Sequence, residues 1–171
     1  AGRIPADHWV QDPDVGGGRV IGEVCHFVDY MHALCASPPT SVFASRVGRH
    51  SSGITEDQCS LSLTFGDGSI GTIIYTAEGS SALQKEHFEA HADGMSLVMS
   101  DFMETRTYHN GKSALFKTAK RDKGFAQEMA QFVQAIEQGL PPVIPFEQID
   151  AVTRACLLAV RSLSSGVAYP L

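Results

Sequence analysis

Short turns between segments of alternating polarity constrain the fold of this chain more than any other feature. From Gln58 to Phe65, apolar residues alternate with serine or threonine, and Gly66-Asp67-Gly68-Ser69 then leads into a second apolar segment at 70–77. Asp93-Gly94 and Asn110-Gly111 separate two further pairs of strand-like segments, and both dipeptides are strong hairpin markers. The middle of the chain is therefore predicted to form antiparallel hairpins, with strands at 41–47, 58–65, 70–77, 85–92, 95–100, 102–109 and 112–118.

Three segments outside the hairpins have the apolar spacing of helices. The first runs from about Gly17 to Cys35, before two prolines that cannot continue it. The second begins near Phe125 and ends at Gly139, and the third ends near Gly166; a glycine suits a helix C-terminus. The residues expected to be buried are Val20, Val24, Phe27, Met31 and Leu34 in the first helix, Phe125, Met129, Phe132, Val133 and Ile136 in the second, and Ile149, Val152, Cys156, Val160 and Leu163 in the third.

This order of elements predicts an α+β fold in a single domain over residues 1–171. A largely antiparallel sheet would carry the helices on one face, and its other face would stay open. Apolar side chains such as Ile74 or Tyr75 are expected on that open face. An uncovered and partly apolar sheet face indicates a subunit interface, so we expect a homo-oligomer.

Composition excludes several classes of function. The 171 residues carry a formal net charge of −6, which argues against a nucleic-acid-binding surface. No apolar run is long enough to cross a membrane, and no signal peptide is apparent at the start. The four cysteines are scattered without a C-x-x-C pair, which is typical of reduced thiols and favours a cytoplasmic protein. The chain starts without methionine inside an irregular stretch, so we expect it to be part of a longer protein.

The first helix contains polar residues whose spacing allows two interpretations. At about 100° per residue, Arg19, Gly22, His26 and Asp29 fall on one stripe, with Glu23 within reach of His26. The simpler interpretation is a solvated helix face. Two features favour a ligand site instead: a helix-weakening glycine lies within the stripe, and the glycines before it would leave the first N–H groups free for a polar or anionic ligand.

Two stretches of the sequence carry a family resemblance. "HWVQDPDVGGGRVIGEVCHFVD" and the closing "RDKGFAQEMAQFVQAIEQGLPPVIPFEQIDAVTRACLLAVRSLSSG" resemble the C-terminal, substrate-binding half of the glucose–fructose oxidoreductase / inositol dehydrogenase / MocA family. The resemblance implies a fold like the C-terminal domain of glyceraldehyde-3-phosphate dehydrogenase. It also implies an N-terminal Rossmann domain that binds NAD or NADP upstream of this chain. Within this chain, no G-x-G-x-x-G run lies between a predicted strand and a predicted helix, as the dinucleotide fingerprint requires.

The same resemblance implies a substrate and a set of site residues. The substrate would be a sugar, nucleotide sugar or inositol-like polyol, oxidised or reduced at a secondary alcohol. The family's helix commonly carries Asp-x-x-x-His; His26 matches the histidine, Gly22 occupies the aspartate position, and Glu23 stands next to it. His26 is then the catalytic base, supported by Glu23. The expected substrate-binding residues are Trp9, Gly17, Gly18, Arg19, Gly22, Asp29 and Lys123.

Two alternatives remain at the level of sequence. Because the aspartate position is a glycine, the chain could be a non-catalytic assembly or ligand-binding module derived from this family. A metal hydrolase is disfavoured, since His87 and His91 would lie about 13 Å apart on a strand at 3.3 Å per residue. We therefore expect no metal, and we expect the 171 residues alone to be inactive because they lack the nucleotide site.

Overall fold

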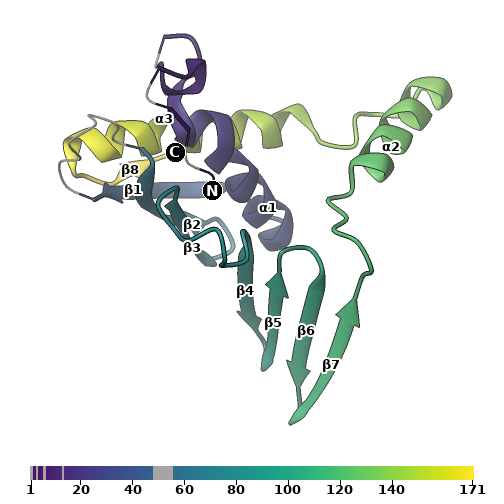
Figure 1. Cartoon of the computed structure of the whole chain (residues 1–171). Helices are drawn as coiled ribbons and strands as arrows, with labels where there is room; N and C mark the ends of the chain where they lie inside the picture. Colours follow the sequence, from purple (N-terminus) through teal and green to yellow (C-terminus); the bar gives the residue numbers. More distant parts are fainter. Residues whose placement is uncertain (1, 3, 6, 13, 48–55) are drawn as a thin grey trace. The chain divides into compact units, whose positions relative to one another are not determined.

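The structure is a computed structural model that describes residues 2, 4–5, 7–12, 14–47 and 56–171 (Figure 1). Contacts between Cα atoms divide the chain into two compact units. The core unit comprises residues 2–78 and 144–171, and the hairpin unit comprises residues 79–143. Sequence length predicted a single domain over residues 1–171, and within the chain the structure distinguishes these two units. Each is described below by itself.

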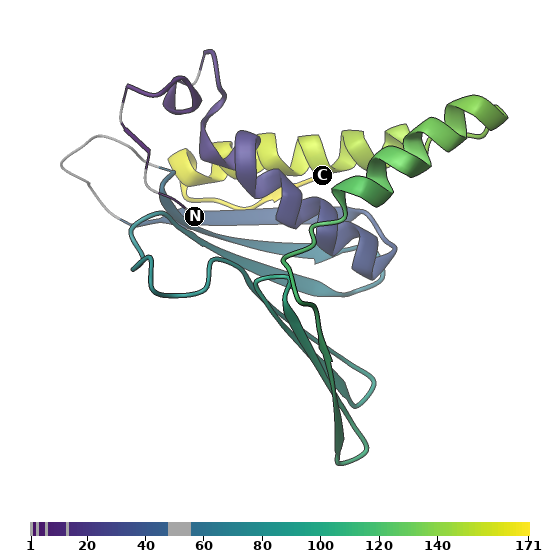
Figure 2. The ribbon, with the colours of Figure 1, turned by 45° about the vertical axis from the view of Figure 1, so that its right-hand side comes forward.

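The core unit is an antiparallel four-stranded sheet with two helices on one face (Figure 2). The strand order is β3-β2-β1-β8. The elements are a short 3-10 helix η1 (Trp9–Gln11), a π-helical segment η2 (Val20–Val24), α1 (Cys25–Cys35), β1 (Pro39–Arg46), β2 (Gln58–Phe65), β3 (Ile70–Thr76), α3 (Phe146–Ser165) and β8 (Tyr169–Pro170). The α+β class and the helix-covered antiparallel sheet are confirmed.

Alternation along β2 creates the core. Leu61 and Leu63 are fully buried beneath the helices, whereas Ser62 between them is exposed on the opposite face. The buried hydroxyl of Ser162 on α3 accepts a hydrogen bond from the N–H of Ala44 on β1 at 2.8 Å and donates to the carbonyl of Val167 at 2.7 Å. This buried polar contact fixes the position of α3 on the sheet, because an unpaired hydroxyl there would be costly.

The opposite face of the sheet is open within the core unit. Ile74 on β3 is 81% exposed, and Ile70 and Phe43 are exposed as well. Tyr75 was wrongly expected on this face: it is buried, because neighbouring residues of a strand point to opposite faces. The short strand β8, which pairs with β1, was not predicted, since two residues are too few for a recognisable pattern.

The hairpin unit is a second antiparallel sheet followed by a helix. Its strands β4 (His87–Ala92), β5 (Met95–Ser100), β6 (Glu104–His109) and β7 (Lys112–Lys117) pair in sequence order. Asp93-Gly94 and Asn110-Gly111 both have positive φ angles at their two residues, as a type I′ turn requires, so these predicted hairpins are confirmed. Asp101-Phe102 turns the chain with the same signs of φ although it contains no glycine.

The predicted antiparallel strands form two four-stranded sheets, one in each unit. The irregular segment 77–86, which includes Gly79-Ser80-Ser81, connects β3 of the first sheet to β4 of the second. The helix of the hairpin unit, α2 (Phe125–Gln138), ends at Gly139 with a φ of 62°, as expected for a left-handed C-terminal residue. No helix among the described residues has the length and hydropathy to span a bilayer.

The open sheet face leads to a testable expectation. Replacing Ile74 with arginine places a charge on the open sheet face that we propose as the subunit contact, so the apparent mass in multi-angle light scattering should fall from an oligomer to a monomer. Leu34→Arg, an exposed apolar position on α1, is the matched control and should leave the mass unchanged. A wild-type chain that is already monomeric at high micromolar concentration would contradict the interface.

Candidate functional site

The three glycines before the first helix are required by the local backbone. Gly17 and Gly18 have φ angles of 72° and 83°, which L-residues with a side chain rarely adopt. A Cβ atom on Gly16 would collide with the backbone of Trp9, and one on Gly18 would collide with the carboxylate of Glu56. These glycines therefore have a conformational and steric role that does not depend on a ligand.

Glu56 occupies the start of the helix. Its carboxylate accepts a hydrogen bond from the N–H of Val20 at 2.9 Å. The expectation that the glycines leave these first N–H groups free for a ligand is therefore wrong at Val20. Burial raises the pKa of Glu56, although the hydrogen bonds from the backbone oppose the shift. A carboxylate of the chain itself thus takes the place at this helix start where we expected a polar or anionic ligand.

The first helix opens with a π-helical segment, which changes the predicted faces. Val20, Val24 and Val28 are fully buried at a constant spacing of four residues. Leu34, which regular α-helical spacing placed in the core, is exposed, and Val28 was missed. A π-helical turn contains more residues than an α-helical one, so side chains on either side of it are rotated relative to each other.

Arg19 is the centre of a buried polar network. Its side chain is only 1% exposed, and Nε donates to Oδ1 of Asp57 at 2.7 Å. Nη1 donates to Oε1 of Glu23 at 2.7 Å, and Nη2 donates to the carbonyl of Gly2 at 2.7 Å. Burial alone would lower the pKa of Arg19. The bond to Asp57 and the surrounding negative charges outweigh burial, so the pKa is raised overall and the guanidinium stays charged.

Glu23 is shared between this network and β3. Its Oε2 accepts a hydrogen bond from the hydroxyl of Tyr75 at 2.7 Å, and the Arg19 guanidinium lies 5.9 Å from the centre of the Tyr75 ring. Burial, followed by the bond to Glu23, raises the pKa of Tyr75 above its usual range. Both carboxylate oxygens of Glu23 are thus engaged by residues other than His26. We refer to Arg19, Glu23, Asp57 and Tyr75 as the arginine network.

Three of the predicted site residues lie along the first helix: Gly22, His26 and Asp29. His26 is exposed and does not lie in the core. Gly22 is exposed too, and a Cβ placed on it would have no atom closer than 3.9 Å, so a side chain fits there. Asp29 accepts a hydrogen bond from the side-chain amide of Gln148 at 2.8 Å, which joins α1 to the start of α3.

The remaining predicted residues, Trp9 and Lys123, belong to different units. Trp9 is 61% exposed on η1, so it does not fill a local core. In the hairpin unit, the ammonium group of Lys123 bonds Oε1 of Glu86 at 2.7 Å and lies 5.2 Å from the centre of the Phe102 ring. Substrate contact by either residue stays a prediction.

Sequence reasoning missed three residues that hold this region together. Glu56 and Asp57 directly precede β2, and Tyr75 occupies an inward position of β3. The available signal was the acidic pair at the entrance to a strand. Spacing along the sequence could not connect it to Arg19, which is 38 positions away.

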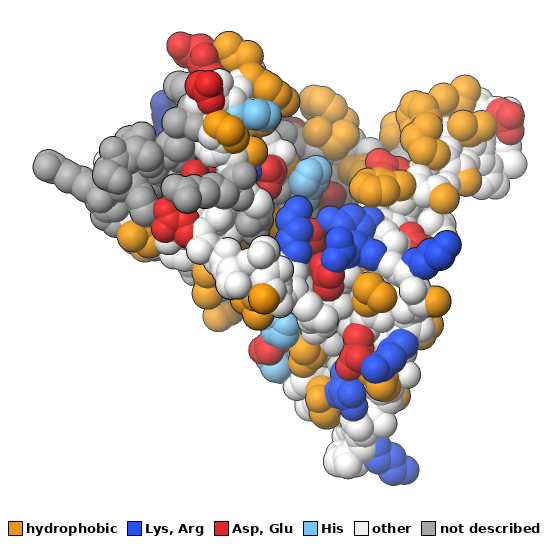
Figure 3. Space-filling view, in the orientation of Figure 1, with side chains coloured by type: hydrophobic (Ala, Val, Ile, Leu, Met, Phe, Trp, Pro, Cys, Tyr) orange, Lys and Arg blue, Asp and Glu red, His pale blue; other side chains and the backbone are white. Residues whose placement is uncertain are grey.

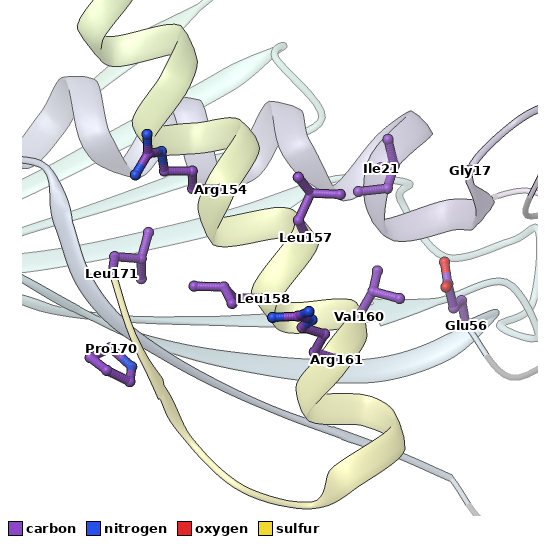
Figure 4. A pocket seen from close by; sticks show the side chains of 10 residues that line it. All are labelled: Gly17, Ile21, Glu56, Arg154, Leu157, Leu158, Val160, Arg161, Pro170 and Leu171. Atoms are coloured by element: carbon purple, nitrogen blue, oxygen red, sulfur yellow. The ribbon is translucent and has the colours of Figure 1, made fainter.

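A shallow pocket of about 810 Å³ lies on the core unit (Figure 4). Its lining comes from α3, the C-terminal segment, the start of the first helix and the segment before β2: Gly17, Ile21, Glu56, Arg154, Leu157, Leu158, Val160, Arg161, Pro170 and Leu171. The pocket is mainly apolar. Gly17 is the one predicted site residue that lines it, and His26 does not.

Neither His87 and His91, which the sequence disfavoured as metal ligands, nor any other group among the described residues forms a candidate metal site. No cluster of three or more His, Cys, Asp or Glu side chains in this part of the chain is placed to hold an ion. His87 and His91 are exposed on β4, and both lie close to the carboxylate of Glu89, at 3.0 Å and 3.7 Å.

Comparisons with known proteins agree with this geometry. The family model described as "GFO/IDH/MocA C-terminal domain" matches residues 1–97, more than half of the chain. A search of curated proteins finds no match. Solved structures with the same fold include aldose-aldose oxidoreductase from Caulobacter crescentus with glycerol, at 14% identity and a TM-score of 0.82 over 99% of this chain and 52% of that one.

Two further solved structures share the fold. A levoglucosan dehydrogenase in complex with NADH and levoglucosan is 16% identical, with a TM-score of 0.82 over 98% of this chain and 54% of that one. UDP-N-acetylglucosamine 3-dehydrogenase from Acidithiobacillus ferrooxidans is 18% identical, with a TM-score of 0.73 over 95% of this chain and 51% of that one. The chain therefore spans about half the length of the structures that it matches.

The arginine network predicts a large effect of removing its cation. Arg19→Met leaves the carboxylate of Asp57 nearly buried without its partner, so the free energy of unfolding should fall by about 3–5 kcal/mol. Arg106→Met, at a more exposed pair with Glu104, is the control and should change it by about 0–1 kcal/mol. Urea unfolding of both variants measures the difference, and equal effects would show that the network does not stabilise the fold.

The raised pKa of Tyr75 predicts a loss of stability at high pH. Above the usual tyrosine pKa of about 10, the phenol ionises in the unfolded chain but stays neutral in the folded one. The contribution of Tyr75 to the free energy of unfolding is therefore complete below a pH of about 10, and it declines as the pH rises further. Urea unfolding at several pH values should show a shallower decline for Tyr75→Phe than for the wild type, whereas Tyr108→Phe, at an exposed position, should behave like the wild type.

Proposed function

Because the chain belongs to the GFO/IDH/MocA C-terminal domain family, we propose that it is the substrate-binding half of an NAD(P)-dependent oxidoreductase. The substrate class is a sugar, nucleotide sugar or inositol-like polyol that reacts at a secondary alcohol. The observation that carries this proposal is His26. It matches the histidine of the family's helix motif, it is exposed, and it follows directly on a helix start fixed by buried contacts.

His26 would move the proton of the reacting hydroxyl. An imidazole suits this role, because its usual pKa of about 6.5 allows it to accept and release a proton near neutral pH. Oxidation of the alcohol also needs a hydride acceptor, and a nicotinamide ring supplies that chemistry when it is bound. The G-x-G-x-x-G run at 66–71 spans the turn between β2 and β3 and does not open a helix, so it is not a dinucleotide fingerprint. The nucleotide would therefore be held mainly by an N-terminal Rossmann half.

Glu23 would contribute indirectly. Its two oxygens accept hydrogen bonds from Arg19 and Tyr75, so we assign it to positioning the first turn of the helix that carries His26. Gly22 and Asp29 share the helix with His26 and would border the substrate, and the exposed ring of Trp9 would pack on a sugar face. The substrate-facing surface of the helix would be supported by the backbone of Gly17, Gly18 and Arg19. Lys123 would contact a polar group of the substrate.

A non-catalytic module remains the second candidate, favoured by one specific observation. The family's aspartate position is Gly22, and the adjacent carboxylate of Glu23 is already engaged in the arginine network. In that case the chain would keep the open sheet face for assembly and lack proton transfer by His26. The homo-oligomer belongs to both candidates, so it does not separate them.

Turnover of the complete enzyme separates the two candidates. His26→Ala should lower kcat by about 10²–10⁴-fold, the usual contribution of general acid–base catalysis, while the circular dichroism spectrum stays unchanged. His87→Ala removes an exposed histidine of the hairpin unit and is the matched control, which should retain full activity. Unchanged turnover of the His26→Ala enzyme would contradict the catalytic role and favour the module.

A further inference from the structure

The fold does not require a glycine at position 22. Gly22 lies inside the first helix, and its backbone is outside the left-handed region that favours glycine. A Cβ atom on it would meet no atom closer than 3.9 Å, whereas Cβ atoms on Gly16 and Gly18 would collide with their neighbours. Glycine also forms helices less readily than alanine. The missing side chain therefore leaves space on the helix that the backbone itself does not need.

The space at Gly22 is bordered by two atoms from the segment before the helix. Cγ1 of Val10 and the carbonyl oxygen of Gly16 both lie 3.9 Å from where a Cβ atom on Gly22 would be. His26 comes four residues later, so it lies on the same side of the helix, and it is exposed as Gly22 is. Figure 3 shows hydrophobic, acidic and histidine side chains gathered over η1 and the first helix. The space at Gly22 thus has an apolar border, a polar border and a histidine one turn away.

The border that carries Val10 is held by contacts to the arginine network. Gln11, next to Val10 on η1, donates from its side-chain amide to both carboxylate oxygens of Asp57 at 3.3 Å. The same carboxylate binds the guanidinium of Arg19, whose side chain is buried. The backbone of η1 also packs so closely on Gly16 that a Cβ atom there would collide with it. The space at Gly22 therefore has a fixed shape, as a site that selects between substrates requires.

A sugar hydroxyl is poorly matched to this space. An aspartate at position 22 would accept a hydrogen bond from such a hydroxyl, and a glycine cannot. The neighbouring carboxylate of Glu23 accepts bonds from Arg19 and Tyr75 instead. A hydroxyl that bonds the carbonyl of Gly16 would leave the apolar side chain of Val10 without contact. An acylamino group meets both borders, because its N–H can donate to a lone pair of that carbonyl and its methyl end is apolar.

We propose that Gly22 determines specificity for a sugar that carries an acylamino group on the carbon next to the reacting one. This inference rests on the proposed function, in which His26 moves the proton of the reacting hydroxyl. Side chains four residues apart on a helix are separated by about 5–6 Å, a distance that an acylamino group on the neighbouring carbon spans. The acyl methyl packs on Val10, and the amide N–H faces the carbonyl of Gly16.

Two sugars that differ only in this group test the specificity of the complete enzyme. N-acetylglucosamine and glucose, each free and as its UDP conjugate, are offered with NAD and with NADP. The acetamido sugar should have a kcat/KM at least about tenfold above that of its hydroxyl counterpart, because only the acetamido group fills the space at Gly22. Equal or better turnover of the hydroxyl sugar would overturn the proposal.

A variant at position 22 ties the preference to the glycine. Gly22→Ala places a methyl group in the space and should reduce the ratio of the two kcat/KM values at least about tenfold. Gly79→Ala adds the same methyl group where no atom lies within 4 Å, so it is the matched control and should keep the ratio. The melting temperature of Gly22→Ala should not fall, since alanine fits the helix there. An unchanged ratio or a lower melting temperature in Gly22→Ala would overturn the proposal.

Binding measured without turnover lets this inference and the proposed function fail separately. Saturation-transfer NMR reports which protons of a bound sugar lie closest to the protein. The acetyl methyl of N-acetylglucosamine should receive the strongest transfer in the wild type and lose it in Gly22→Ala. This methyl signal without turnover of any sugar would contradict the proposed function and leave the acylamino site in place. Turnover without the methyl signal would overturn the inference and leave the function in place, and the absence of both would overturn both.

Discussion

The Arg19 guanidinium is the interaction on which the core unit depends. It is buried, and it joins residues that are distant in sequence: Asp57 at the entrance to β2, Glu23 on the π-helical segment, and the backbone carbonyl of Gly2. Through Glu23 the same network reaches the hydroxyl of Tyr75 on β3. A buried cation is tolerated because each of its charged and polar neighbours is satisfied, and such a network specifies one arrangement of helix and sheet.

The sequence predicted the parts of this fold that depend on local patterns. The alternation in β2, the turns Asp93-Gly94 and Asn110-Gly111, and the glycine at the end of α2 each encode their conformation within a few residues. Patterns of this kind do not show which strands join. The division into two sheets depends on which edges pair, and the pairing of β8 with β1 depends on two residues at the far end of the chain.

The candidate site shows the same limit more sharply. The spacing of residues predicted the helix, placed His26 away from its buried side and drew attention to the glycines. The physical reason for the glycines differs from the one that we expected. Gly18 leaves room for Glu56, and Glu56 takes the N–H of Val20 that we expected a ligand to use. An α-helical wheel also assumes a constant angle per residue. The π-helical segment breaks that assumption at Val20–Val24, so the buried line passes through Val28 instead of Leu34.

The residues that fix the first helix on the sheet and the proposed catalytic residue thus lie at different positions along that helix. Arg19 and Glu23 lie in the first turn and are held by buried contacts, whereas His26 comes one turn later and is exposed. Contacts from three directions fix the backbone before His26, so its imidazole can be aimed without being buried in this chain. Proton transfer in enzymes is favoured where water is excluded, and an exposed side chain acquires that environment only when another surface covers it. Under the proposed role of His26 in proton transfer, a residue placed in this way would belong to a site that is completed when another surface covers it.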